Sequence, residues 1–147
     1  MAKYDYFIAG RWRNKDSIKP VLDLVRHNGK SAYCFLENDY TGEVIELSMG
    51  GDPEDFMARL ENLPQKHPFI RKIFEIDMRA ERDADIFLLV FPAGIAAHIE
   101  AGVAYGLGKK CLAIGELEKT ETLYNIFQHI FPTVNDFEAW LKSPAVT

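Results

Sequence analysis

The chain has 147 residues, of which 48% are hydrophobic and 27% are charged, and its formal net charge is −5. These fractions are those of an ordinary globular domain and argue against a disordered chain or a membrane protein. The basic residues are scattered along an acidic chain, which argues against binding to a nucleic-acid polymer. The length predicts a single domain over residues 1–147.

The termini and the cysteines bear on where the protein works. The opening residues, MAKYDYF, lack a basic segment followed by the apolar core of a signal peptide. No apolar run approaches the roughly 18 residues that a membrane-spanning helix requires. Cys34 and Cys111 fall in predicted strands, where a free thiol behaves as a small apolar group. We therefore expect a cytoplasmic protein with no membrane partner, no disulfide framework and no zinc site.

The first half of the chain alternates between short apolar runs and helical patterns. The predicted elements are a strand over 4–9 (YDYFIA), a helix from 16 or 17 to 27, a strand over 32–36 and helices over 53–62 and 69–82. Asp16 or Ser17 is the expected cap of the first helix, and Asn28-Gly29 ends it. The polar stretch 37–52 predicts a functional loop or a small excursion of its own.

The second half repeats this alternation with a stronger signal. The predicted elements are a strand over 85–91 (DIFLLVF), a helix over 96–107, a strand over 111–115, a helix over 120–128, a strand over 130–131 and a helix over 134–142. A continuous apolar run such as 85–91 is typical of a strand covered on both faces. The alternation predicts an α/β fold: a doubly wound, flavodoxin-like (Rossmann-like) parallel sheet of five strands, with helices on both faces.

The glycines of GVAYGLGKK do not form a phosphate-binding loop. Five residues separate Gly102 from Gly108, no Ser or Thr follows the lysines, and the glycines end a helix instead of starting one. Gly106 and Gly108 are the expected cap of the helix. Gly102 costs roughly 1 kcal/mol relative to alanine inside a helix, so we expect it to allow close packing on the sheet. The four histidines lie far apart in the sequence and predict no metal site.

In a doubly wound sheet, ligands bind where the strand order reverses, beside the carboxyl ends of the strands. For the order 2-1-3-4-5, the turns after the first and third strands meet at that point. The first turn offers a glycine, two guanidinium groups and an indole, which suit an anion and a flat ring: Gly10, Arg11, Trp12 and Arg13. The second turn would present backbone N–H groups at a helix N-terminus, at Gly94 and Ile95.

Glu100 lies just inside the helix that follows the third strand. The positive end of the helix macrodipole favours its ionised form, which a carboxylate nucleophile requires. The alternative is that an early glutamate stabilises the helix and does nothing else. His98, two residues away, would not face Glu100, and we expect a structural or substrate-positioning role for it. Asp77, taken alone, is an ordinary solvated helix residue.

Three segments together resemble a known family: the strand and turn YFIAG, a helical aspartate before ADIFLLV, and HIEAGVAYGLGKKC. They resemble the nucleoside 2-deoxyribosyltransferases, including the related 2′-deoxynucleoside 5′-monophosphate N-glycosidases. The resemblance implies that Glu100 attacks the anomeric carbon of the sugar and that Asp77 assists the departing base. It also implies a homodimer or larger homo-oligomer, and no cofactor is expected. Gly94 stands where the transferases carry an aspartate and the monophosphate hydrolases a serine.

The predicted function is cleavage of the N-glycosidic bond of 2′-deoxynucleosides or their 5′-monophosphates. The sugar would pass to another base or to water, and the partner is a small-molecule nucleoside or nucleotide. Arg11 and Arg13 favour a 5′-phosphate on the substrate, although surface arginines are common. Two alternatives stay open: a non-catalytic nucleotide-binding or sensing domain of the same fold, and an NAD-type N-glycohydrolase.

Overall fold

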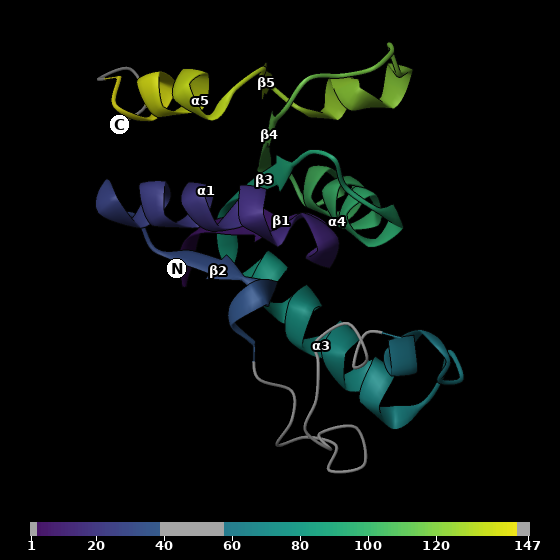
Figure 1. Ribbon diagram of the computed structural model, residues 1–147. Helices are drawn as coiled ribbons and strands as arrows, with labels where there is room; N and C mark the ends of the chain where they lie inside the picture. The colour runs from purple at the N-terminus through teal and green to yellow at the C-terminus, as the bar shows by residue number, and fades with distance from the viewer. Residues whose placement is uncertain (1–2, 39–57, 144–147) are drawn as a thin grey trace. The chain divides into compact units, whose positions relative to one another are not determined.

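The computed structural model describes residues 3–38 and 58–143 (Figure 1). The chain divides into two compact units, one formed by residues 1–36 and 80–147 and the other by residues 37–79. The larger unit contains the whole sheet. A single domain over residues 1–147 remains a prediction, because the division into compact units does not test it.

The sheet of the larger unit has five parallel strands in the order β2-β1-β3-β4-β5. The strands are β1 (Tyr4–Ala9), β2 (Ala32–Cys34), β3 (Ala84–Val90), β4 (Lys110–Ile114) and β5 (His129–Phe131). The reversal of strand order lies between β1 and β3, which pair from Tyr4↔Ala84 to Ala9↔Leu89. The predicted flavodoxin-like α/β fold is confirmed.

Alternate strand residues supply the two faces of the sheet, because successive side chains of a strand point to opposite sides. Tyr6 and Ile8 of β1 belong to one buried cluster, together with residues of α1 (Lys15–His27) and α5 (Val134–Leu141). Phe7 of β1 belongs to a second cluster, together with residues of α4 (Ile95–Gly106). Figure 1 shows α1 and α5 on one side of the sheet and α4 on the other. Helices thus cover both faces, as predicted.

Most predicted elements lie within two residues of the observed ones. The predicted helix over 69–82 is α3 (Pro68–Arg82), and β2 ends two residues early, where a short 3-10 helix, η2 (Phe35–Glu37), begins. Of the helix predicted over 53–62, residues 58–61 are helical. Its start, like residues 39–52 of the polar stretch, lies outside the described residues.

The start of α1 differs from the prediction. A 3-10 helix, η1 (Trp12–Asn14), runs directly into α1, so Asn14 takes the cap position in place of Asp16 or Ser17. The Asn14 side chain makes no capping hydrogen bond, and its amide nitrogen donates to Phe91 O in the turn after β3.

The predicted helix over 120–128 is wrong in type. Residues Thr122–Ile126 form a 3-10 helix, η3, which begins with the Glu121 carboxylate accepting from the Leu123 N–H at 3.1 Å. Phe127 is already extended and buried, because the chain must enter β5 at His129. The segment is too short for a two-turn α-helix between these two anchors.

The C-terminus of α4 is closed by Gly108. Its φ of +78° is a left-handed conformation that favours glycine, and its N–H donates to Tyr105 O at 3.0 Å. The next N–H, of Lys109, reaches Ala104 O at 3.0 Å, which completes a Schellman motif. The cap predicted at Gly108 is confirmed, whereas Gly106 is the last helical residue and takes no part in the cap.

Gly102 does not pack against the sheet, so that prediction is wrong. The residue is exposed, and a Cβ built on it would meet no atom within 4 Å. The close approach to the sheet is made by the opposite side of α4, through Ala97, Ala101 and Ala104.

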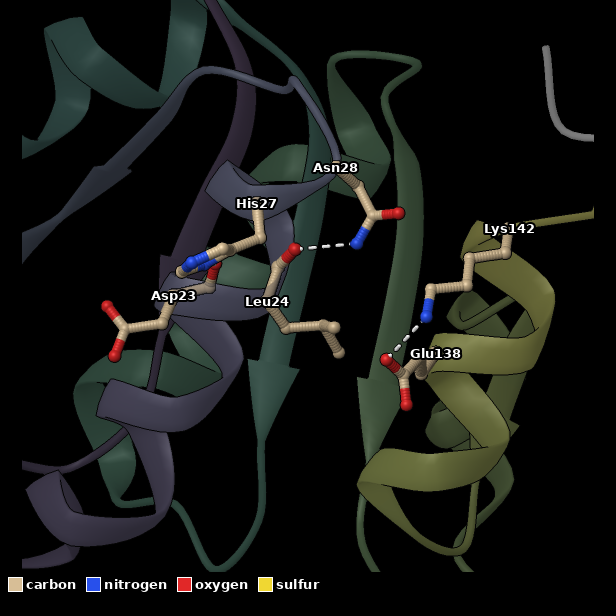
Figure 2. Close-up of polar contacts among 6 residues, drawn as sticks. All are labelled: Asp23, Leu24, His27, Asn28, Glu138 and Lys142. Atoms are coloured by element: carbon tan, nitrogen blue, oxygen red, sulfur yellow. Dashed lines mark hydrogen bonds and ion pairs between the residues drawn. The ribbon is translucent and has the colours of Figure 1, made fainter.

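The far ends of α1 and α5 are closed by local side-chain contacts (Figure 2). Asn28 Nδ2 donates to Leu24 O at 2.8 Å, which satisfies one of the last carbonyl groups of α1. In α5, Lys142 Nζ lies 2.8 Å from Glu138 Oε2, an exposed i,i+4 pair that contributes at most about 1 kcal/mol. Both helices run back from the carboxyl ends of the strands, so these contacts stabilise the edge of the sheet away from the predicted site.

No helix in the described parts of the chain is long and apolar enough to cross a membrane. Cys34 in β2 and Cys111 in β4 are buried thiols.

Burial, together with the negative charge of Glu81, raises the pKa of the Cys111 thiol from 9.0 to about 11. The folded protein therefore holds this proton more tightly than the unfolded chain. The associated stability is complete below pH 9 and is lost as the pH rises toward 11. We expect the free energy of unfolding to fall by about 1 kcal/mol between pH 8.5 and pH 10, and to fall less in Cys111→Ala. Urea unfolding at a series of pH values measures both slopes, and equal slopes would contradict the assignment to Cys111.

Candidate functional site

The turn after β1 passes close to the end of β3. A Cβ on Gly10 would lie 2.7 Å from Ile18 Cδ1 and 3.3 Å from Val90 O. A larger residue would push the Ile18 side chain aside and crowd the Val90 carbonyl. Gly10 thus lets the turn leave the sheet at the point where the strand order reverses.

The turns after β1 and β3 lie side by side. Asn14 Nδ2 donates to Phe91 O at 3.2 Å and to Pro92 O at 3.3 Å. Arg11 Cβ is 4.0 Å from the position that a Cβ on Gly94 would take. The structure therefore brings together the two turns that the strand order predicts to meet.

The side chains of the first turn form a cationic, aromatic surface. Arg11 and Arg13 are exposed, and Trp12 is half-buried with Lys15 Nζ 5.0 Å from its ring centroid. Trp12 Nε1 is buried and has no hydrogen-bond partner among the described residues. A guanidinium group and an indole N–H are donors suited to an anionic or carbonyl-bearing ligand.

Gly94 is the N-cap of α4 and has an extended backbone, with φ −93° and ψ −168°. Its carbonyl accepts from the His98 N–H at 3.3 Å and from His98 Nδ1 at 2.7 Å. No atom lies closer than 4.0 Å to the position of a Cβ, so a polar side chain would fit at Gly94 without strain. Ile95, at the first helical position, has its side chain 82% exposed.

His98 connects the start of α4 to η3. Because Nδ1 faces a carbonyl group, it carries the proton, and in the neutral ring Nε2 accepts from the Tyr124 hydroxyl at 2.9 Å. The rings of His98 and Tyr124 stack with centroids 5.7 Å apart, and Phe91 packs against both. Both ring nitrogens therefore take part in hydrogen bonds that fix the orientation of the ring, as a positioning residue requires.

Glu100 is half-buried and is the sixth residue of α4. The first turn of α4 contains no acidic residue, so Glu100 lies beyond the part of the helix where the macrodipole acts most strongly. The dipole argument from the sequence is therefore weaker than expected. At ~100° per residue, Glu100 and His98 lie on different sides of the helix, as predicted.

Asp77 is half-buried on α3, within the unit formed by residues 37–79. Its role in catalysis stays a prediction, as do the binding roles of the residues in the two turns.

Sequence reasoning missed Asn14 and Tyr124 as site residues. Asn14 lies in the turn that the sequence singled out, but nothing in the pattern indicates that its amide reaches Phe91. Tyr124 lies in the segment predicted to be a helix over 120–128, and only the folded chain places its hydroxyl against His98.

In residues 3–38 and 58–143, no group of three or more His, Cys, Asp or Glu side chains is arranged to hold a metal ion.

No protein-family model matches the sequence, and no curated protein matches it either. Among the solved structures that match, two cover nearly the whole chain. A 2-deoxyribosyltransferase from the psychrotolerant bacterium Bacillus psychrosaccharolyticus is 18% identical, with a TM-score of 0.60 over 92% of this chain and 94% of its own. The CMP N-glycosidase BcmB of Clostridium botulinum is 17% identical, with a TM-score of 0.55 over 94% of this chain and 98% of its own. The chain therefore shares its fold with a 2-deoxyribosyltransferase and with a nucleotide N-glycosidase.

Proposed function

We propose that this protein cleaves the N-glycosidic bond of 2′-deoxynucleosides or their 5′-monophosphates. Glu100 is the proposed nucleophile, and Asp77 is the proposed proton donor to the departing base. The sugar then passes to water or to a second base. The substrate is a small molecule, and no cofactor takes part.

The observation that carries this proposal is the pairing of the turns after β1 and β3. Asn14 links them through Phe91 O and Pro92 O, and Arg11 lies beside Gly94. Glu100 follows six residues after Gly94, on the helix that begins at this pair of turns. The fold shared with a 2-deoxyribosyltransferase and a CMP N-glycosidase supports a nucleoside or nucleotide as the ligand.

The chemistry has two steps. A Glu100 carboxylate oxygen forms a bond to the anomeric carbon while the bond to the base nitrogen breaks and its electron pair leaves with the base. The departing nitrogen takes up a proton, for which Asp77 is the proposed donor. Water or another base then attacks the anomeric carbon and releases the Glu100 carboxylate, while the proton that the attacking group loses returns to the Asp77 carboxylate. This division between two carboxyl groups parallels that of retaining glycosidases.

The test is a panel of substrates with product analysis. Purified protein is incubated with deoxynucleosides, deoxynucleoside monophosphates, ribonucleoside monophosphates and NAD, each with and without an acceptor base. Chromatography then detects the free base or the exchanged base. Consumption of NAD, with no reaction of the other substrates, would favour the NAD-type reaction instead.

A non-catalytic binding domain gives a different result. Gly94 supplies no side chain at a position where the resembling enzymes carry a polar one, which favours this second candidate. It predicts a rise in melting temperature with nucleotides but no product from any member of the panel. If the protein gave no product and nucleotides did not raise its melting temperature, both candidates would be contradicted.

Arg11→Ala tests whether a 5′-phosphate is recognised. The guanidinium group is exposed beside the two turns, and charge-assisted hydrogen bonds to a phosphate are among the stronger polar contacts. We expect the KM for deoxynucleoside monophosphates to rise by about 10-fold, with little change for the unphosphorylated nucleosides. Steady-state kinetics on matched pairs of substrates measure this difference. Lys19→Ala, an exposed change on α1, is the control, and an equal rise for both substrate classes would exclude phosphate recognition by Arg11.

A further inference from the structure

The turn after β3 is held in place by its carbonyl groups. The carbonyls of Phe91 and Pro92 accept from Asn14, and the Gly94 carbonyl accepts twice from His98. The Ile95 N–H, by contrast, donates to no group in residues 3–38 and 58–143, as is usual for the first N–H of a helix. The protein thus fixes the acceptors of this turn and leaves a donor at the start of α4 for another molecule.

His98 determines the direction of that donor. The Gly94 carbonyl and the Ile95 N–H belong to one trans peptide group, which is planar and carries its C=O and N–H on opposite sides. His98 holds the carbonyl through Nδ1 at 2.7 Å and through its own N–H at 3.3 Å. A side chain that fixes the carbonyl therefore also fixes the Ile95 N–H, which points out of the N-terminal end of α4.

The His98 ring is itself held by Tyr124. One hydrogen bond at Nδ1 leaves an imidazole free to rock about its bond to the backbone, and the Tyr124 hydroxyl supplies a second contact by donating to Nε2 at 2.9 Å. The two rings stack with centroids 5.7 Å apart, and the Phe91 ring packs against both. Loss of the hydroxyl would leave the stacking but free one end of the imidazole.

The position of Tyr124 is set by the sheet and not by α4. The residue lies in η3, which begins at the Glu121 carboxylate through its contact with the Leu123 N–H. Directly after η3, Phe127 is buried and the Gln128 N–H donates to Cys111 O of β4 at 2.8 Å. The Tyr124 hydroxyl is therefore a fixed point against which the start of α4 is oriented.

We propose that Tyr124 is a positioning residue for the N-glycosidic reaction. Acting through His98, it orients the Ile95 N–H toward an acceptor oxygen of the substrate. This proposal rests on the proposed function, because it takes the turn at Gly94 and Ile95 as part of the binding site. A contact away from the bond that breaks is equally strong before and during the reaction, so the Tyr124 hydroxyl lowers the KM and leaves kcat unchanged.

Tyr124→Phe is the first test, because it removes the hydroxyl and keeps the ring. We expect the KM to rise by about 10-fold and kcat to change by less than about 2-fold. Steady-state kinetics on each substrate that the panel identifies measure both constants. Tyr105→Phe is the matched control, since it removes the hydroxyl of an exposed tyrosine on the same helix, and both constants should stay unchanged.

A double-mutant cycle tests whether Tyr124 acts through His98. An asparagine amide can donate to the carbonyl four residues back in a helix, as Asn28 does to Leu24 O at 2.8 Å (Figure 2). His98→Asn should therefore keep a contact with Gly94 and have a lower KM than His98→Ala. Adding Tyr124→Phe to His98→Asn should change the KM by less than about 2-fold, because the partner of the hydroxyl is already gone.

NMR of the labelled protein tests the same contacts without a substrate. Proton–nitrogen correlations of the His98 ring should show the proton on Nδ1 in the wild type and a mixture of both tautomers in Tyr124→Phe. Relaxation of the Ile95 backbone amide should show faster motion in Tyr124→Phe than in the wild type or in Tyr105→Phe. A purely structural hydroxyl would lower the melting temperature without either change.

Three results would overturn the proposal. One is a fall in kcat with an unchanged KM in Tyr124→Phe, which is the effect of losing folded, active protein. Another is an effect of Tyr124→Phe that persists in full when His98→Asn is already present. The third is an Ile95 amide whose motion is the same in Tyr124→Phe and the wild type. This last result decides the role of Tyr124 even if the wild type cleaves no substrate and the proposed function fails.

Discussion

Glu100→Gln is expected to lower kcat by at least about 10³-fold on the best substrate of the panel. Glutamine keeps the size and shape of the side chain and one accepting oxygen, but its neutral amide oxygen is a poor nucleophile toward the anomeric carbon. The loss corresponds to about 4 kcal/mol of transition-state stabilisation. Chromatographic release of free base, measured at saturating substrate, gives kcat directly.

Two comparisons separate a chemical role of Glu100 from a structural one. Glu138→Gln removes an exposed carboxylate of α5 and its pair with Lys142, and it should leave kcat unchanged. The melting temperature of Glu100→Gln should stay within a few degrees of the wild type, because the side chain is only half-buried. Near-normal turnover in Glu100→Gln would remove the glutamate from the mechanism. A large fall in melting temperature would instead indicate the structural role that an early helix glutamate can also have.

The topology of the sheet could be predicted because its signals are local. The run IFLLVF over 86–91, which follows Asp85, is apolar throughout, and the observed β3 is buried at Phe87 to Val90, where both faces are covered. The alternation of strands and helices then leaves few arrangements, since crossovers between parallel strands are right-handed. The meeting of the turns after β1 and β3 follows from this topology alone.

The residues that hold the two turns together could not be predicted, because their contacts are long-range. The Asn14 amide donates hydrogen bonds to carbonyl groups 77 and 78 positions away. His98 appeared as a lone histidine, and its hydroxyl partner lies 26 residues further along the chain. Local propensity cannot predict such pairs, because they depend on how separate elements pack against each other.

The prediction that Gly102 packs closely on the sheet was wrong for a related reason. A glycine inside a helix signals that something approaches its backbone, but the sequence does not say from which side. We assumed the sheet, whereas the sheet is contacted by the alanines of α4 and Gly102 is exposed. Helix energetics identify an unusual residue, but they cannot say which side of α4 the glycine lies on.

Gly115→Ala is expected to lower the free energy of unfolding by about 3 kcal/mol. Gly115 follows β4 with a φ of +134°, a conformation that residues with a side chain rarely adopt. An added Cβ would lie 2.7 Å from Phe91 Cβ and 3.5 Å from Phe91 Cα. These atoms are fixed close to the backbone of β3, so the clash cannot be relieved by rotating the end of a side chain. Urea denaturation measures the loss.

Gly29→Ala is the comparison for backbone strain without a steric clash. Gly29 also has a positive φ, of +78°, but a Cβ there would meet no atom within 4 Å, so only the backbone conformation is strained. We expect a loss of about 1 kcal/mol for Gly29→Ala. The difference between the two variants then measures the contact with Phe91 together with the added strain of a φ of +134° relative to +78°. Phe91 also carries the carbonyl that Asn14 holds, so displacement of Phe91 should raise the KM of Gly115→Ala but not that of Gly29→Ala. Equal losses of stability in the two variants would show that backbone strain alone makes residue 115 a glycine.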